Sequence, residues 1–247
     1  MSQTVPLLFD DDVETGGKEN DIENDFAYRN NVQNATKAIR LGFIRKVYGL
    51  LTMQLVLTVV IASIFMFTPQ IKEYVHSNDW MMLVSFILSI GLLIGLHIKR
   101  RESPTNLILL AGFTVVQAYT VGVVVTYYSQ AVVIQALVLT LVVLGGLTAY
   151  TFQTKHDFSA MHSGLFAGLC ILIVGGFMQV FLQSSIFEII LSFGGALVFC
   201  LFIVFDTQMI IQNLSAEEYI LATITLYLDI INLFIYILRI LQQVNNQ

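Results

Sequence analysis

The sequence has few charged residues, few prolines and few cysteines, and each shortage excludes a class of protein. Only 12% of its 247 residues are charged and 56% are hydrophobic, which excludes a soluble globular domain. Three prolines and 16 glycines exclude a fibrous or low-complexity chain. The two cysteines, Cys170 and Cys200, lie in apolar runs, where an unpaired thiol behaves as a small hydrophobic side chain. The composition indicates a polytopic membrane protein.

Clustered metal ligands are also lacking. The four histidines are dispersed along the chain, and none forms a ligand pair at positions i and i+4. We therefore expect no cofactor and no catalytic metal, and we expect no nucleic-acid partner. The histidines are His76, His97, His156 and His162.

The net charge of −5 reflects an acidic N-terminal tail more than the rest of the chain. Residues 1–37 contain eight acidic and three basic side chains and no apolar periodicity. This pattern predicts a disordered cytosolic tail, followed by one transmembrane domain over residues 38–247. The tail also lacks the apolar core of a cleavable signal peptide, so we expect the first membrane helix to act as the targeting signal.

Seven apolar runs are long enough to cross a bilayer, because each supplies close to the ~20 residues that a core of ~30 Å requires. Their connections are short, so neighbouring helices are expected to pack antiparallel in an all-α bundle. The last run carries polar side chains, and we leave open whether it spans the membrane or re-enters it. Gly-Gly pairs at 145–146, 175–176 and 194–195 predict close helix contacts. The runs are 44–67, 80–98, 106–127, 131–152, 162–182, 187–211 and 219–241.

Basic residues in the short loops predict the orientation in the membrane. They concentrate on the side that holds the N-terminus, whereas the opposite side offers Lys72 alone. The positive-inside rule therefore places the N-terminus in the cytosol. Two glycosylation sequons, which begin at Asn34 and Asn213, fall on the cytosolic side and are expected to stay unmodified.

Three carboxylates lie within or at the ends of the last two runs. Glu188 and Asp206 are 18 residues apart, which is five helical turns, so they share one helix face about 27 Å apart. Asp229 lies in the middle of the last run. It belongs to a polar stripe about 60° wide, at 100° per residue, on an otherwise apolar helix. The stripe consists of Glu218, Thr225, Asp229, Asn232 and Tyr236.

Asp206 and Asp229 can meet, because their helices are antiparallel and joined by a short connection. Two carboxylates that approach each other in an apolar interior share a proton, and such a pair forms a proton-sensitive switch. Fully deprotonated, it would suit a transient calcium ion. A structural alternative is that these acids only hydrogen-bond neighbouring helices. For Glu217 and Glu218 the alternative is a capping box that begins at Ser215.

Several segments resemble the transmembrane Bax-inhibitor motif family. The residues that carry the resemblance are FDTQ (205–208) and LSAEEYILATITLYLDIINLFIYILRIL (214–241). IRLGFIRKVYGLL (39–51), SPTN (103–106) and EEY (217–219) are similar to its Golgi anti-apoptotic protein, or lifeguard, branch. The similarity runs from about residue 24 to the C-terminus.

The resemblance implies a bundle of seven helices with the last at the centre. It further implies a pH-sensitive calcium leak through intracellular membranes, which lowers store calcium and suppresses apoptosis. Asp206 and Asp229 match the family's di-aspartyl sensor, and Glu217 matches an acid tied to conduction. A basic residue that latches the sensor in a bacterial relative falls within residues 99–101, where we choose Arg100.

On this basis the ion pathway is expected to include Glu188, Glu217, Glu218 and Asn232, with calcium as the permeant ion. The protein is expected in the Golgi, with the endoplasmic reticulum as the alternative. Its partners are the lipid bilayer, calcium and protons. Apoptosis regulators, calcium-release channels and a second copy of the chain are candidate partners.

Other functions remain open at this point. A non-conducting scaffold that binds death regulators and a proton-coupled cation exchanger fit the same composition. An intramembrane aspartyl protease would also use two aspartates on adjacent helices. Leu-Tyr-Leu precedes Asp229 where such proteases carry Gly-x-Gly, and no Pro-Ala-Leu element occurs. We therefore expect no enzymatic activity.

Overall fold

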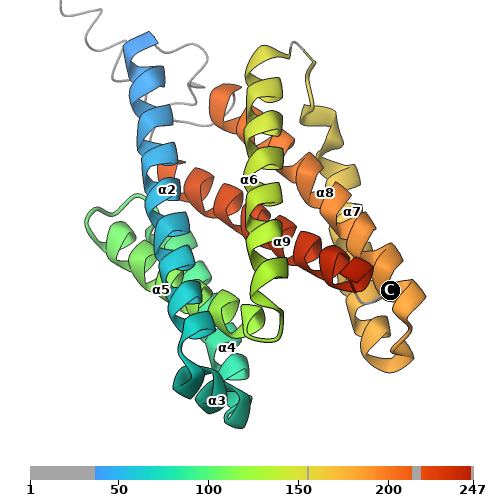
Figure 1. The fold of residues 1–247 in the computed structure, drawn as a ribbon. Helices are drawn as coiled ribbons and strands as arrows, with labels where there is room; N and C mark the ends of the chain where they lie inside the picture. The colour runs from blue at the N-terminus through green and yellow to red at the C-terminus, as the bar shows by residue number, and fades with distance from the viewer. Residues whose placement is uncertain (1–36, 155, 213–217, 246–247) are drawn as a thin grey trace, which may run out of the picture.

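The computed structural model describes residues 37–154, 156–212 and 218–245, and within these residues it contains helices and no strand. In this described part of the chain seven helices are long and apolar enough to cross a membrane, which confirms the predicted all-α bundle (Figure 1). A short helix, α3, and one 3₁₀ turn, Ser159–Met161, lie between them. The long helices are α2 (Lys37–Phe67), α4 (Trp80–Lys99), α5 (Thr105–Val125), α6 (Gln130–Gln153), α7 (His162–Leu182), α8 (Ser185–Gln212) and α9 (Tyr219–Asn245).

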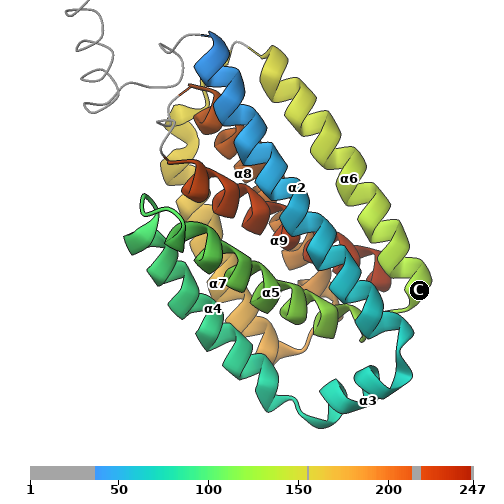
Figure 2. The same cartoon turned by 90° about the vertical axis from the view of Figure 1, so that its left-hand side faces the viewer.

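The last helix, α9, lies at the centre of the bundle. In its most apolar stretch of 18 residues, 67% of the residues are buried by the rest of the protein. The corresponding share is 11–44% in the other six long helices. It packs against α8, α6, α2, α5 and α4, and Figures 1 and 2 show it crossing the middle of the molecule. Its 27 residues form one unbroken helix, about 40 Å long, which is enough to cross the hydrocarbon core.

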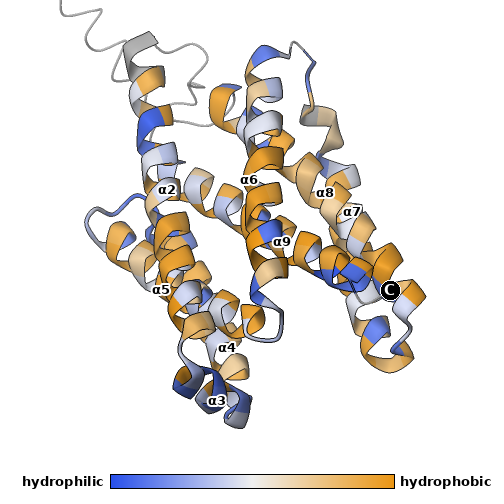
Figure 3. Ribbon diagram, viewed as in Figure 1, coloured by the Kyte–Doolittle hydropathy of each residue, from blue (hydrophilic) through white to orange (hydrophobic). Residues whose placement is uncertain are grey.

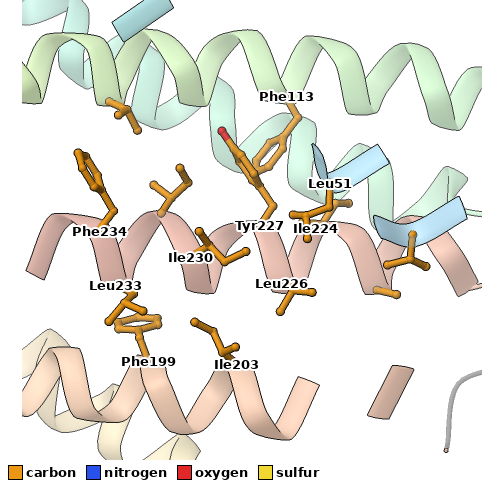
Figure 4. Close-up of a cluster of buried hydrophobic side chains, with 14 of the residues drawn as sticks. Leu51, Phe113, Phe199, Ile203, Ile224, Leu226, Tyr227, Ile230, Leu233 and Phe234 are labelled. Carbon is orange, nitrogen blue, oxygen red and sulfur yellow. The ribbon is translucent and has the colours of Figure 1, made fainter. Parts of the chain in front are cut away.

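Large apolar side chains hold α9 in place from both sides. Tyr227 meets Phe113 of α5 edge to face, with 6.3 Å between ring centroids. On the other side, Leu233 and Leu226 point toward Phe199 and Ile203 of α8 (Figure 4). These contacts leave α9 little freedom to rotate, so its polar stripe has a fixed direction.

Many apolar residues of the long helices, which Figure 3 colours orange, lie exposed on the outside of the bundle. Side chains on α7 such as Ile171 and Phe177 are each 68% exposed. Soluble monomers rarely expose apolar patches larger than a few hundred Å². Lipid therefore accounts for this surface better than water does.

Sequence patterning does not predict the helix α3 (Pro69–Ser77), which is short and carries Lys72 and Glu73. Pro69 occupies its first turn, where a missing N–H costs no hydrogen bond. Its His76 ring stacks on Tyr127, with 4.3 Å between centroids, and is hydrogen-bonded to the Thr126 hydroxyl at 2.8 Å. These contacts fix α3 across the end of the bundle opposite the start of α2 (Figure 2).

The Gly-Gly pairs at 175–176 and 194–195 make the predicted close helix contacts, each through one glycine, and the pair at 145–146 does not. A Cβ on Gly175 would overlap Leu191, and one on Gly195 would overlap the ring of Tyr236. Their neighbours Gly176 and Gly194, and both glycines of the 145–146 pair, meet nothing within 4 Å. Consecutive residues point about 100° apart on a helix, so only one glycine of a pair can face a given neighbour.

Some predictions concern residues outside the described part of the chain. These are the acidic tail as far as residue 36, both sequons, the Ser215 cap and the pathway residue Glu217.

Candidate functional site

Asp206 and Asp229 meet at the contact between α8 and α9. Asp206 lies six residues before the end of α8, and Asp229 lies ten residues after the start of α9. Their side chains are hydrogen-bonded to each other, which for two carboxyl groups requires a proton between them. Asp229 is only 7% exposed, and its Oδ2 has no hydrogen-bond partner among the described residues. The structure thus brings together the two aspartates singled out in the sequence.

Two further side chains contact or influence this pair. The Thr225 hydroxyl, on the same stripe of α9, is hydrogen-bonded to Asp206. His162, the first residue of α7, interacts electrostatically with Asp206, and its ring lies 5.7 Å from that of Phe205. Sequence reasoning missed His162, because an isolated histidine 44 residues from Asp206 carries no signal of proximity.

The polar stripe of α9 continues beyond the aspartates. The Asn232 amide donates to the Leu228 carbonyl at 2.8 Å, so this hydrogen bond stays within α9. The Tyr236 ring stacks on Phe199, with 5.7 Å between centroids, and rests against Gly195. Asn232 and Tyr236 line a cavity of about 400 Å³ between α7, α8 and α9.

At the far end of α9 the predicted pathway residue Glu188 already has a partner. Its Oε2 accepts a hydrogen bond from the Gln243 amide at 3.0 Å. Tyr128, in the α5–α6 connection, interacts with Glu188 and accepts a hydrogen bond from the Arg239 guanidinium. Burial raises the pKa of Tyr128, and Arg239 offsets part of that rise. A positive charge, that of Arg239, therefore lies close to the predicted pathway residue Glu188.

The opposite end of the stripe, at the start of α9, also has arginines beside it. Glu218 forms ion pairs with Arg100 and Arg101, each at 3.6 Å. Arg100 was expected to latch Asp206, and the structure pairs it with Glu218 instead. The physical reason is distance along α9. Arg100 follows the last turn of α4, level with the first turn of α9, whereas Asp229, which contacts Asp206, lies about 16 Å further along α9. The latch role of Arg100 stays a prediction.

The start of α9 is held by a second set of contacts. Lys46 Nζ of α2 lies 3.3 Å from the ring centroid of Tyr219. The Tyr219 hydroxyl accepts a hydrogen bond from the Asn106 amide at 3.1 Å, and the same amide reaches the Arg100 carbonyl at 2.9 Å. This network ties α2, the α4–α5 connection and α9 together.

The oxygen atoms of the pair are too few to hold a resident calcium ion. Calcium takes six to eight oxygen ligands in protein sites. Among the described residues no group of three or more His, Cys, Asp or Glu side chains could hold a metal ion. Asp206 and Asp229, with the Thr225 hydroxyl, offer fewer oxygens than a resident calcium requires. Transient calcium binding at this pair remains a prediction.

Comparison with known proteins agrees with the sequence resemblance. Residues 40–246 match the family described as inhibitor of apoptosis-promoting Bax1. The chain is 42% identical over 236 residues to protein lifeguard 4 of Mus musculus, covering 96% of this chain and 99% of that protein. It is 44% identical over 226 residues to the Golgi anti-apoptotic protein of Vaccinia virus (strain Lister), covering 92% and 95%. It is 39% identical over 229 residues to Bax inhibitor 1 of Schizosaccharomyces pombe, covering 92% and 86%. The chain therefore belongs to the transmembrane Bax-inhibitor family, in its lifeguard and Golgi anti-apoptotic branch.

Proposed function

We propose that this protein is a pH-sensitive calcium leak channel of intracellular membranes, which lowers store calcium and thereby suppresses apoptosis. The observation that carries the proposal is the contact between Asp206 and Asp229 in an apolar interior. Charged groups inside a membrane domain are expensive and mark ion or proton pathways by default. Two of them in contact form a site that responds to protons and attracts cations.

The pathway follows the polar stripe of α9 along its contact with α8. Thr225, Asp229, Asn232, Tyr236, Arg239 and Gln243 recur at intervals of three or four residues, which keeps them on one face. In this proposal the described conformation is the closed one. Tyr236 sits on Gly195, and a guanidinium lies at each end, Arg100 on Glu218 and Arg239 on Tyr128.

Protonation of the aspartate pair controls the opening of this pathway. One shared proton lets the two carboxyl groups bond to each other. Loss of that proton places two like charges in contact at low dielectric, which favours separation of α8 and α9. A change in pH thus shifts an equilibrium between closed and open arrangements of the helices.

The test is calcium flux through purified full-length protein in liposomes, measured across a pH series. Wild-type protein should conduct with a pH dependence that Asp229→Asn removes. Asp79→Asn is the matched control, because that carboxylate is exposed in the connection between α3 and α4. Flux that is identical for wild type and Asp229→Asn at every pH would contradict the sensor.

The names of the relatives motivate the cellular part of the proposal. One is called a Golgi anti-apoptotic protein and another Bax inhibitor 1. We place this chain in the Golgi membrane with a cytosolic N-terminus, and we expect expression to protect cells from apoptosis. Protease protection of an N-terminal tag in sealed Golgi vesicles tests the orientation.

A non-conducting scaffold for apoptosis regulators is the second candidate. The same family names support it, because none of them mentions an ion. Wild-type liposomes that leak calcium no faster than protein-free liposomes, together with retained protection of cells, would favour the scaffold.

A further inference from the structure

A second cavity, of about 570 Å³, lies between α2 and α6 and is separate from the aspartate pair. The α9 residues Ile230, Ile231 and Phe234 form its floor. Side chains of α2 and α6 form its two walls, and α5 contributes Val121 and Val125. Both views of the ribbon show α2 and α6 running alongside each other with α9 crossing behind them (Figures 1 and 2).

The walls of this cavity offer water almost no hydrogen bonds. Five hydroxyl side chains line it. The four Ser and Thr hydroxyls each donate to a carbonyl four residues earlier in their own helix, and the Tyr48 hydroxyl is hydrogen-bonded to Thr207 and Thr148. A buried water molecule needs two to four polar partners. The cavity is therefore suited to hydrocarbon. The four bonds are Thr52 to Tyr48 (2.7 Å), Thr58 to Gln54 (2.8 Å), Ser63 to Val59 (2.7 Å) and Thr140 to Ala136 (2.7 Å).

The length and depth of the cavity match the interior of a bilayer. On α2 the lining extends from Tyr48 to Phe67, which is about 28 Å along the helix axis, close to the ~30 Å of a hydrocarbon core. On α6 the first lining residue is Val133 and the last is Leu144, also inside a membrane-spanning segment. The rim is open sideways, since Val56 and Ile134 are each 54% exposed. The cavity is thus continuous with the lipid-facing surface.

We propose that this groove binds an acyl chain of a membrane phospholipid, inserted between α2 and α6 and lying on α9. A long, narrow and continuously apolar groove fits a flexible chain, and an empty groove would forfeit the dispersion contacts of its lining. The chain's own N-terminal tail is unsuitable, because its carboxylates would be placed at hydrocarbon depth. The bound chain supports the face of α9 next to Asp229, so it acts as a structural lipid.

The test uses full-length protein in liposomes that contain a phosphatidylcholine with a diazirine on one acyl chain. After illumination, lipid adducts are located by mass spectrometry of peptides. Ile230, Ile231 and Phe234 are 3%, 7% and 8% exposed, so lipid on the outer surface cannot reach them. Adducts on these three residues are the expected result and report occupancy of the groove.

Matched variants separate groove binding from general lipid contact. Val133→Phe fills the groove, whereas Val138→Phe makes the same change on the same helix at an exposed position outside it. We expect loss of the α9 adducts in Val133→Phe and in Ala62→Phe, and their retention in Val138→Phe. Adducts on the exposed Ile171 of α7 should persist in all three, which shows that the variants are folded in the bilayer.

Two outcomes overturn the proposal. Wild-type protein without α9 adducts, but with adducts on α7, shows that no acyl chain enters the groove. A diazirine sterol that labels α9 while the phospholipid does not shows that the groove takes a rigid sterol instead. Neither outcome depends on whether the protein conducts calcium.

Discussion

Asp206 of α8 and Asp229 of α9 are hydrogen-bonded to each other through their carboxyl groups, in a region where apolar side chains surround both helices. Each carboxyl group lessens the cost of burying the other only while a proton is shared between them. The pair is therefore a structural contact between two helices, and the proposed response to pH rests on the proton that the two groups share.

The contact predicts different stabilities for two substitutions of Asp229. Asn keeps the size of the side chain and can donate to Asp206, whereas Ala leaves Asp206 without this partner. We expect Asp229→Ala to lower the free energy of unfolding by about 1–3 kcal/mol and Asp229→Asn to lower it less. Thermal unfolding in detergent measures both, and equal losses would show that the hydrogen bond contributes nothing.

Gly195 and Gly194 should respond in opposite ways to the same change. A Cβ on Gly195 overlaps the Tyr236 ring, so Gly195→Ala should destabilise the protein by about 1–3 kcal/mol. A Cβ on Gly194 meets nothing within 4 Å, so Gly194→Ala should be neutral or stabilising by up to ~1 kcal/mol. The comparison is made by thermal unfolding. Similar effects of the two variants would contradict the close contact of Tyr236 with α8.

Arg239 should act as an electrostatic barrier at its end of the pathway. Removing its charge in Arg239→Gln should raise the calcium flux in liposomes by about tenfold, because a guanidinium repels an approaching cation. Arg239→Lys keeps the charge and should conduct like wild type. Lys72→Gln, an exposed basic residue of α3, is the control for general surface charge. Reduced flux in Arg239→Gln would indicate that the residue holds the helix end and does not repel ions.

Tyr219 makes two contacts that two substitutions can separate. Tyr219→Phe loses the hydrogen bond from Asn106 but keeps the ring beneath Lys46, and should cost about 1–3 kcal/mol of stability. Tyr219→Leu loses both contacts and should cost a further ~0.5–1 kcal/mol. Unfolding in detergent at low and high salt gives both values. Identical losses would mean that the Lys46 contact contributes nothing.

Tyr128 should make the protein sensitive to alkali. Burial raises the pKa of Tyr128 above its ordinary value of ~10, so the folded state favours the neutral phenol. The contribution of Tyr128 to the free energy of unfolding is therefore fully present below about pH 10 and is lost as the pH rises through the folded-state pKa. Tyr128→Phe should weaken the loss of stability in alkali, measured as the melting temperature against pH. The exposed Tyr150→Phe is the control, and an identical alkaline loss in wild type and Tyr128→Phe would contradict this role.

Helix positions follow closely from the local pattern of residues. The apolar runs 80–98 and 162–182 differ from α4 and α7 by at most one residue at either end. In a membrane protein, the length and hydrophobicity of a run are sufficient to predict a helix. The reason is that every backbone group within the bilayer must form its hydrogen bond inside its own segment. The short helix α3 escaped prediction, since its nine residues carry two charged side chains and no apolar run.

The partners of the polar side chains follow from the sequence less well. Helical periodicity places Asp229, Asn232 and Tyr236 on one face, and the antiparallel order of α8 and α9 brings Asp206 within reach. Periodicity carries no information on helix crossing or axial offset. Arg100 therefore meets Glu218 where Asp206 was expected, and Gln243 and Tyr128, with Arg239 beside it, lie next to Glu188, which no local pattern showed.

The sequence alone determined that this is a bundle of seven apolar helices with acids in its last two, because burial in lipid leaves a chain few other structures. The tertiary structure alone decided which residues contact the acids, which partners the arginines at the two ends of α9 have and where a groove opens between α2 and α6. Those features depend on packing between helices distant in sequence, and packing is set by side-chain shape at contacts that no local pattern encodes.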